Sequence, residues 1–272
     1  MEDSSFKRRR FLLSLPCNLL YSSVKFSPAR GAPLTVEPGH KEKVLRVAQV
    51  TLRYLEDRDI GGVLEVESNI EEGKGCGSST ADCVAAVHGV AEALGKPLAE
   101  EEVAALVVEA ELASDNFMFN HPVLFAHREG VVLEELGPRL PRMEVLGIDT
   151  DIDGAVYTLD FPPATYTWRQ VQNFHLLVSA LRRAVRHRDL GLLGRVATAS
   201  AMINQQFLPK PMFAEILRIS EMAGVPGISV AHSGTVMGIL LNPDEPTLEA
   251  KVHSICQELE RLGIKRILRF QT

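Results

Sequence analysis

The sequence has few cysteines and no long apolar run. Its four cysteines, Cys17, Cys76, Cys83 and Cys256, form no CxxC pair and no cluster with histidine at zinc-binding spacing. A chain of this length needs no disulfide framework, so we expect reduced thiols in a cytoplasmic protein. No segment approaches the roughly 18 apolar residues that a membrane-spanning helix requires. The sequence therefore predicts no membrane partner.

A strongly basic face is also missing. Lysine and arginine number 29 against 35 aspartates and glutamates, which gives a formal net charge of −6. Binding to nucleic acid depends on clustered positive charge, so this class of function is excluded. The basic run Lys7 to Arg10 raises a different question. It precedes apolar residues 11–15 and resembles the start of an export signal. Pro16 and Asn18 interrupt the apolar run, and we expect these residues to belong to the folded protein.

The composition is that of a globular protein without repeats or low-complexity segments. Of the 272 residues, 46% are hydrophobic and 24% are charged. Periodicity and turn residues predict the elements of the first half. These are strands at 11–15, 19–26 and 62–67, helices at 42–55, 79–94 and 100–112, and a hairpin formed by 123–125 and 131–133.

The second half predicts a different arrangement. Strands are expected at 143–148, 155–159, 227–231, 236–241 and 264–270, and helices at 171–186, 190–203, 212–223 and 247–262. Strand 143–148 and the elements after residue 212 give the β-α-β-β-α-β order of a ferredoxin-like unit, with extra helices inserted. The predicted fold class is α+β in two lobes that divide near residue 140.

A glycine-rich loop, Gly73 to Thr80, follows a predicted strand and opens a predicted helix. Its glycines allow backbone N–H groups to approach an anion, and the helix dipole adds positive potential there. Three hydroxyl residues follow, which can cap the helix, bind phosphate or ligate magnesium. An ordinary glycine turn is the alternative, but three alternating glycines favour phosphate binding. The spacing is neither that of a Walker A loop nor G-x-G-x-x-G, so the loop by itself indicates phosphate binding and no more.

The loop resembles that of a known family. Gly75 to Ala81 is similar to the P-x-x-x-G-L-G-S-S-A-A loop of the GHMP kinases, and Lys74 to Asp82 resembles the K-G-M-A-S-S-T-A-D loop of their L-threonine kinase branch. Three further segments resemble the same branch in the same order along the chain. They are Leu124-Phe125 with His127, Leu208-Pro209-Lys210-Pro211 with Phe213, and Val230 to Val236.

The resemblance implies a two-lobed GHMP kinase fold. Residues 1–140 would form an ATP-binding lobe like the second domain of ribosomal protein S5, and residues 141–272 a ferredoxin-like lobe. It implies ATP and Mg²⁺ as cofactors and a small hydroxyl-bearing substrate, without nucleic acid or membrane. For the L-threonine kinase branch, the product is O-phospho-L-threonine for the side chain of cobalamin.

The resemblance also assigns candidate site residues. The expected ATP-binding residues are Lys74, Gly75, Cys76, Gly77, Ser78, Ser79 and Thr80, and those near the phosphates are His232, Ser233 and Gly234. Asp115, within a Ser-Asp-Asn segment, is the expected catalytic residue that faces the acceptor hydroxyl. Ser79 and Glu111 are the expected metal ligands. Plain alternatives stay open for single residues: a solvated lysine at Lys74, surface acids at Glu111 and Asp115, a structural histidine at His232 and a surface or turn residue at Asp149.

Three departures from the family pattern keep other functions open. Glu71 replaces the usual proline and Cys76 a larger apolar residue. Residues 1–10 also do not carry the S-C-G-E-like motif that lines the acceptor site in the family. Two alternatives follow: a GHMP kinase for another small alcohol, homoserine or a mevalonate-type compound, or a nucleotide-binding protein without catalysis.

Overall fold

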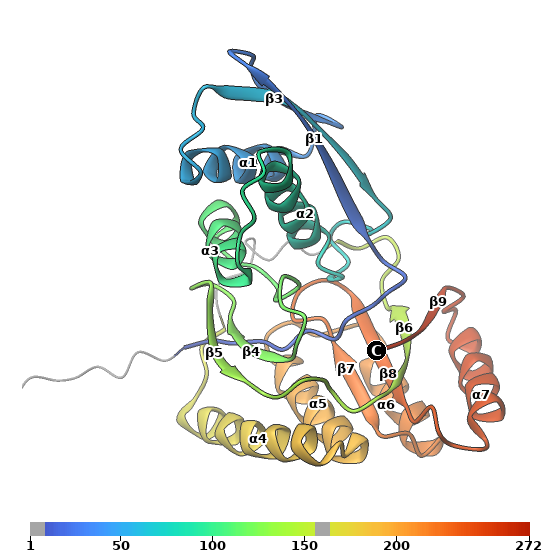
Figure 1. Ribbon diagram of the computed structural model, residues 1–272. Coiled ribbons are helices and arrows are strands. Elements are labelled where there is room, and N and C mark those ends of the chain that lie inside the picture. The colour runs from blue at the N-terminus through green and yellow to red at the C-terminus, as the bar shows by residue number, and fades with distance from the viewer. Residues whose placement is uncertain (1–8, 156–163) are drawn as a thin grey trace, which may run out of the picture. The chain divides into compact units, whose positions relative to one another are not determined.

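The computed structural model describes residues 9–155 and 164–272, which form two compact units (Figure 1). The first unit consists of Leu20–Asn69, Ser78–Pro138 and the described part of Met1–Leu15. The second consists of Pro16–Leu19, Ile70–Gly77 and the described part of Arg139–Thr272. The glycine-rich loop therefore belongs to the second unit up to Gly77, and the helix that it opens belongs to the first. Four residues of the strand predicted at 155–159 lie outside the described part.

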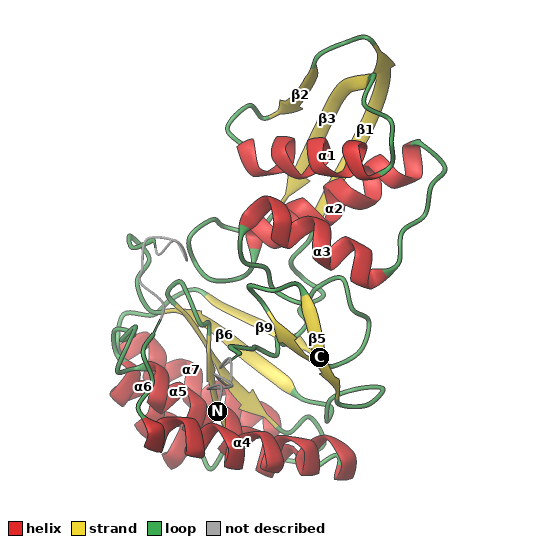
Figure 2. Cartoon of the chain, turned by 90° about the vertical axis from the view of Figure 1, so that its left-hand side faces the viewer, coloured by secondary structure: helices red, strands yellow, loops and turns green. Residues whose placement is uncertain are grey.

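The first unit is built on a three-stranded sheet. Strands β1 (Ser22–Arg30) and β2 (Leu34–Glu37) flank β3 (Ile60–Ser68), which is antiparallel to β1 and parallel to β2. Helices α1 (Glu42–Tyr54) and α2 (Ser78–Ala93) cover one face of this sheet, and α3 (Glu100–Glu111) packs against both helices (Figure 2). Each helix agrees with its predicted range to within one residue.

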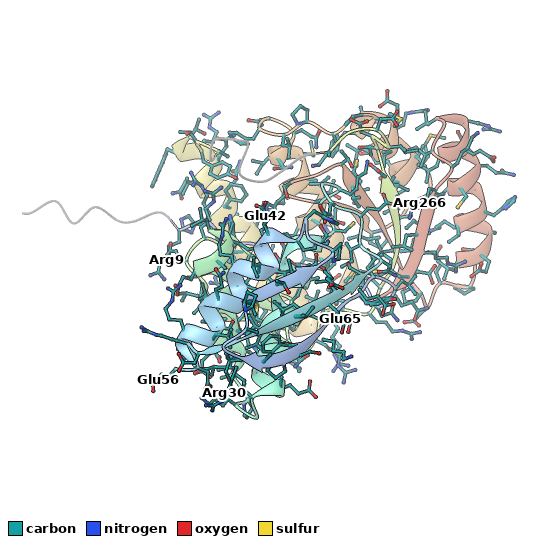
Figure 3. The ribbon with its side chains drawn as sticks, turned by 90° about the horizontal axis from the view of Figure 1, so that it is seen from above. Arg9, Arg30, Glu42, Glu56, Glu65 and Arg266 are labelled. Carbon is teal, nitrogen blue, oxygen red and sulfur yellow. The ribbon has the colours of Figure 1, made fainter. Side chains whose placement is uncertain are left out.

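Apolar periodicity places the core of the first unit. Helix α1 buries Val44, Val47 and Ala48 at the 3.6-residue spacing of an amphipathic helix. Leu64 of β3 is fully buried among them. The outer sheet face carries exposed side chains such as Glu65, which pairs with Lys25 at 3.4 Å (Figure 3). Alternation between the two faces therefore fixes the register of β1 on β3.

The predicted hairpin is present as β4 (Val123–Ala126) and β5 (Val131–Glu135), paired antiparallel. The strand predicted at 11–15 is wrong as an extended element. Only Leu12 pairs, exchanging two backbone hydrogen bonds of 3.0 Å with Phe125. Pro16 lacks an N–H and closes the segment before a longer ladder can form.

The second unit is built on a four-stranded antiparallel sheet. Its strands are β6 (Glu144–Asp149), β7 (Gly227–Val230), β8 (Val236–Leu241) and β9 (Ile267–Gln271), in the spatial order β7-β8-β6-β9. Each edge strand pairs with its neighbour antiparallel, as the ferredoxin-like order requires. The predicted α+β fold with a ferredoxin-like unit is confirmed.

Helices cover the sheet of the second unit. Helices α6 (Phe213–Met222) and α7 (Leu248–Arg261) share a core with the strands, in which Ile216 and Ile255 are buried against Ile239. The two inserted helices, α4 (Trp168–His187) and α5 (Leu190–Asn204), pack against each other, and α5 lies along β7. The turn between β7 and β8 lies beside the glycine-rich loop, to which it is joined by backbone hydrogen bonds.

Candidate functional site

The glycine-rich loop is built from alternating left-handed residues. Gly73, Gly75 and Gly77 have φ angles of 73°, 87° and 72°. L side chains rarely adopt this conformation, so the three glycines are what the backbone path requires. Helix α2 begins directly afterwards at Ser78. The first N–H groups of a helix have no partner within it, so the start of α2 is a candidate anion-binding end.

The β7–β8 turn packs onto this loop within the second unit. The N–H groups of Thr235 and Val236 both donate to the carbonyl of Lys74, at 2.9 and 3.1 Å. A Cβ atom at Gly75 would lie 2.0 Å from the carbonyl oxygen of Ser233. Such a contact would force the backbone apart, so the two segments can touch only with glycine there. The turn with the predicted phosphate-proximal residues thus buttresses the loop directly.

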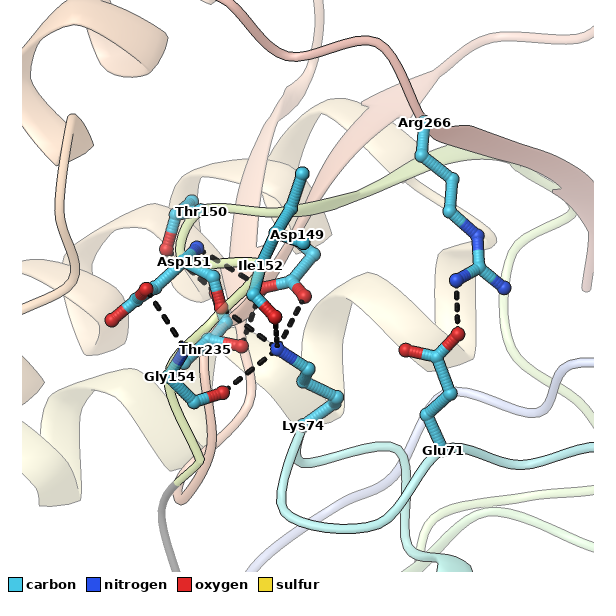
Figure 4. A network of polar contacts seen from close by, with 9 residues as sticks. All are labelled: Glu71, Lys74, Asp149, Thr150, Asp151, Ile152, Gly154, Thr235 and Arg266. Carbon is cyan, nitrogen blue, oxygen red and sulfur yellow. Dashed lines mark hydrogen bonds and ion pairs between the residues drawn. The ribbon is translucent and has the colours of Figure 1, made fainter.

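Lys74 anchors the loop to the end of β6 and the residues that follow it (Figure 4). Its ammonium lies 2.9 Å from the Asp149 carboxylate and donates to the carbonyls of residues 151, 152 and 154, at 2.8, 2.6 and 2.7 Å. The side chain is only 11% exposed. The alternative of a solvated loop lysine is therefore wrong. In this arrangement the ammonium is occupied, and the predicted contact of Lys74 with ATP depends on its backbone.

Asp149 has a structural role that the sequence did not reveal. The turn or surface position that we expected is wrong, since its carboxylate accepts hydrogen bonds from Lys74 and from the hydroxyl of Thr235. Burial alone would raise the pKa of this carboxyl, but the bonds from Thr235 and Lys74 hold it below the usual value. A charged Asp149 therefore fixes the loop and the β7–β8 turn to the end of β6.

In the first unit, the start of α2 meets the end of α3. The hydroxyl of Ser79 donates a hydrogen bond to Oε1 of Glu111. The ammonium of Lys43, from the start of α1, donates to Ser79 Oγ at 2.9 Å and lies 3.2 Å from Glu111 Oε1. The structure therefore brings the two predicted metal ligands together. Lys43 is a third member that carried no recognisable motif.

Glu111 is deeply buried, and its expected alternative as a surface acid is wrong. Its side chain is 2% exposed, and Oε2 has no hydrogen-bond partner among the described residues. Burial raises the pKa of this carboxyl, against the lowering effect of Ser79 and Lys43. A buried carboxylate oxygen without a partner is costly unless a cation or donor binds it.

These oxygens suit magnesium. The described residues contain no cluster of three or more His, Cys, Asp or Glu side chains able to hold a metal. Mg²⁺ does not need one, because it usually binds through one or two carboxylates together with substrate phosphates and water. The free oxygen of Glu111 and the hydroxyl of Ser79 are hard donors of this kind.

Asp115 lies just beyond the end of α3. The helix ends at Glu111, and the next residue, Leu112, caps it with a left-handed φ of 67° that turns the chain. The backbone N–H of Asp115 donates to Thr80 Oγ1 at 3.2 Å, so the first turn of α2 holds the Asp115 backbone. Asp115 is half-buried. Thr80 is itself buried, and its side chain positions Asp115.

A buried ion pair secures the first turn of α2. Asp82 accepts from the Lys41 ammonium at 2.7 Å and from the Ser22 hydroxyl at 2.6 Å. Strand β1, the residue that precedes α1 and helix α2 are joined at this carboxylate. The pair keeps the predicted phosphate-binding end of α2 in a fixed position.

The predicted site residues thus fall into two groups, one in each unit, which adjoin in the chain where Ser78 follows Gly77. Ser78, Ser79, Thr80, Glu111 and Asp115 belong to the first unit. Lys74, Gly75, Cys76, Gly77, His232, Ser233 and Gly234 belong to the second. Within the latter group His232 is exposed, whereas Gly234 is buried against the loop.

Two further residues carry charge near these groups and were not predicted as site residues. Lys43 has no sequence signal beyond its place at the start of a helix. Lys210 lies within the Leu-Pro-Lys-Pro segment, and its ammonium donates to the carbonyl of Gly234. A charged residue between two prolines was the available signal, because such a segment is unusually rigid.

The chain is similar in sequence to known proteins. Residues 42–121 match the model of the GHMP kinases N terminal domain. The chain is 30% identical over 209 residues to an L-threonine kinase of Salmonella typhimurium, covering 76% of this chain and 66% of that protein. It is 30% identical over 237 residues to an L-threonine kinase of Citrobacter freundii, covering 82% of this chain and 76% of that protein. The chain thus spans just under two thirds of the Salmonella relative.

Solved structures share the fold. A mevalonate kinase of L. major in complex with R-mevalonate matches with a TM-score of 0.67 at 18% identity, over 92% of this chain and 86% of that one. A homoserine kinase of Cytophaga hutchinsonii matches with a TM-score of 0.67 at 19% identity, over 92% and 84%. No helix in the described part of the chain has the length and apolar character to span a membrane. The chain belongs to the GHMP kinases, a family of small-molecule kinases that use ATP as co-substrate.

Proposed function

We propose that this chain transfers the γ-phosphoryl group of ATP to the hydroxyl of L-threonine. The product would be O-phospho-L-threonine, which we assign to synthesis of the cobalamin side chain. The observation that carries the kinase assignment is the Ser79–Glu111 pair, which lies directly after a glycine-rich loop at the N-terminal end of α2. The choice of threonine is supported by the names of the two curated relatives.

The ATP phosphates would bind to the backbone of Gly75 to Ser79. The glycines place no side chain over this backbone, and the start of α2 adds N–H groups without partners in the helix, together with positive potential. Ser79 and Glu111 would hold Mg²⁺, which neutralises charge on the phosphates when bound. Lys43 already supplies a positive charge to the same two side chains and would assist this neutralisation.

Asp115 would orient the acceptor hydroxyl and receive its proton. Phosphoryl transfer asks for little covalent chemistry from the protein, so positioning of this hydroxyl is the main requirement. The hydrogen bond from the Asp115 backbone to Thr80 fixes the residue relative to the start of α2. A carboxylate held in this way can accept a proton without moving its backbone.

The assignment is tested by supplying ATP, Mg²⁺ and single acceptors to the purified protein. L-threonine, L-serine, L-homoserine and R-mevalonate are compared by their kcat/KM values, with product identified by mass spectrometry. We expect phosphorylation of L-threonine with the highest kcat/KM. A higher value for another acceptor would overturn the substrate and leave the kinase assignment in place.

A second candidate is a kinase for another small alcohol, homoserine or a mevalonate-type compound. It is favoured by the fold shared with a homoserine kinase and a mevalonate kinase. Binding of ATP without phosphorylation of any acceptor would instead favour a nucleotide-binding protein without catalysis. We place the reaction in the cytoplasm, where the thiols of the four free cysteines stay reduced.

A further inference from the structure

The segment that joins α5 to α6 holds buried hydrogen-bond donors that have no acceptors. The amide nitrogens Nδ2 of Asn204 and Nε2 of Gln205 are both buried, and neither has a partner among the described residues. Lys210, five residues later, is only 4% exposed. All three lie within the second unit, at the C-terminal end of α5 and in the loop that follows.

The orientation of the Gln205 amide is fixed by its neighbour. The backbone N–H of Lys210 donates to Gln205 Oε1 at 2.8 Å. A backbone N–H can only donate, so the side-chain oxygen must face it and the NH₂ group must face away. The donor without a partner is therefore assigned by the hydrogen bond itself.

Lys210 has the same excess of donors. Its ammonium carries three N–H groups, and its one hydrogen bond within the described residues goes to the carbonyl of Gly234. The described ion pairs include none from Lys210 to a carboxylate. Burial lowers the pKa of its ammonium to about 8. Such a cation is costly to bury, and the cost falls when an anion binds to it.

The position of this ammonium connects it to the phosphate loop. Gly234 packs on the backbone of Lys74 and Gly75, where a Cβ atom on Gly234 would lie 2.2 Å from the nitrogen of Gly75. The acceptor of Lys210 is thus the same residue that touches the glycine-rich loop. An anion on Lys210 would lie beside the turn that supports the ATP phosphates.

We propose that Lys210, with the amide groups of Asn204 and Gln205, forms an oxyanion-binding site for a reactant. The carboxylate of an amino-acid acceptor and a phosphate oxygen share the required chemistry, since each offers acceptors and negative charge. Segment 204–210 supplies an ammonium and two amide NH₂ groups, which can donate to the oxygens of a carboxylate or of a phosphoryl group. The existence of the site is inferred from the donors without partners. The identity of its ligand as the acceptor carboxylate rests on the proposed function.

The test replaces the charge and measures binding of two kinds of probe. Lys210→Met keeps the length of the side chain and removes its charge, and Gln205→Glu keeps the acceptor for the Lys210 N–H while removing the NH₂ donor. Lys251→Met is the matched control, because Lys251 is a half-buried lysine of the same unit whose ammonium pairs with Glu245 at 2.6 Å. Folding of each variant is checked by its unfolding transition.

One arm measures the dissociation constants of L-threonine and of L-threoninol, which lacks the carboxylate. The other arm measures those of inorganic phosphate and ATP. We expect one of two results for Lys210→Met and Gln205→Glu. In the first, affinity for threonine falls about tenfold or more while affinity for threoninol changes little. In the second, affinity for phosphate and ATP falls by the same factor. The first result identifies the carboxylate and the second the phosphate. Both sets of constants within twofold of the wild type in folded variants would overturn the site.

This outcome is distinct from failure of the proposed function. If the unmodified protein phosphorylates homoserine instead, the first arm uses homoserine and its alcohol homologue, and the same comparison applies. If no acceptor is phosphorylated, the phosphate arm alone decides. In that case, unchanged affinity for phosphate and ATP would overturn the site.

Discussion

A Cβ atom on Gly234 would stand 2.2 Å from the backbone nitrogen of Gly75. The β7–β8 turn and the glycine-rich loop therefore touch through bare backbone, at a residue whose φ is +80°. No side chain fits between the two segments without moving one of them. The shape of the predicted phosphate site depends on this contact.

Replacing Gly234 by alanine should displace the loop. We expect Gly234→Ala to lower the free energy of unfolding by about 2 kcal/mol, from the left-handed conformation and the contact combined. ATP affinity should fall as well, because the loop backbone shifts. Gly224→Ala is the control, since Gly224 has a φ of +61° but open space around it. Equal ATP affinity in the two variants would contradict a role for the contact.

Replacing Glu111 by glutamine should weaken the use of magnesium. The buried Oε2 and the Ser79 hydroxyl are the proposed ligands, and an amide is a poorer ligand than a carboxylate. We expect the Mg²⁺ concentration for half-maximal activity to rise about tenfold or more, comparable to losses seen on altering metal sites. Glu109→Gln, an exposed change on the same helix, should leave it unaltered. An unchanged Mg²⁺ requirement in Glu111→Gln would remove Glu111 from the metal site.

The same carboxyl should give stability a distinctive pH dependence in the absence of Mg²⁺. Burial raises the folded-state pKa of Glu111 above 4.5, so its contribution is fully present below pH 4.5 and is lost as the pH rises through the folded pKa. Glu111→Gln should therefore gain stability relative to the unmodified protein between pH 4 and pH 7.

Glu102 provides the opposite case on the same helix. The hydrogen bond from Tyr54, and then that from the Ala99 backbone, lower the pKa of Glu102. The contribution of Glu102 to folding stability is present above pH 4.5 and is lost as the pH falls. Relative to the unmodified protein, Glu102→Gln should therefore lose stability as the pH is raised from 4 to 7. Urea unfolding of both variants at the two pH values checks the signs. Parallel changes in the two variants would contradict the difference in burial.

Replacing Asp115 by asparagine should reduce turnover selectively. Loss of a proton acceptor costs about 100-fold or more in kcat, whereas the backbone bond to Thr80 is retained. ATP affinity should stay within about twofold. Asp59→Asn, at an exposed position in the same unit, controls for the loss of charge. Full turnover in Asp115→Asn would exclude Asp115 from the mechanism.

Much of the fold was predictable because apolar periodicity is local information. Helix 42–55 differs by one residue from α1, whose buried stripe includes Val44 and Val47. Strand β2 was missed, since four residues between Pro33 and Pro38 are too few to show alternation. The strand expected at 11–15 failed because its pairing depends on Phe125, more than a hundred residues away.

The candidate site was predictable where a motif carries it. The resemblance led to Ser79 and Glu111, and the structure brings their side chains into contact. The roles of Lys43 and Asp149 were not predictable, because each depends on a partner brought close only by tertiary packing. A lone charged residue has no periodicity or spacing that distinguishes a buried partner from a solvated one.

The central claim is that the chain transfers phosphate from ATP to the hydroxyl of L-threonine. The most direct measurement follows ³¹P NMR spectra of the protein with ATP, Mg²⁺ and L-threonine, with Asp115→Asn in parallel. The account predicts the resonance of O-phospho-L-threonine together with ADP, formed much more slowly by the variant. Consumption of ATP without this resonance, or its appearance at equal rates in both proteins, would contradict the account.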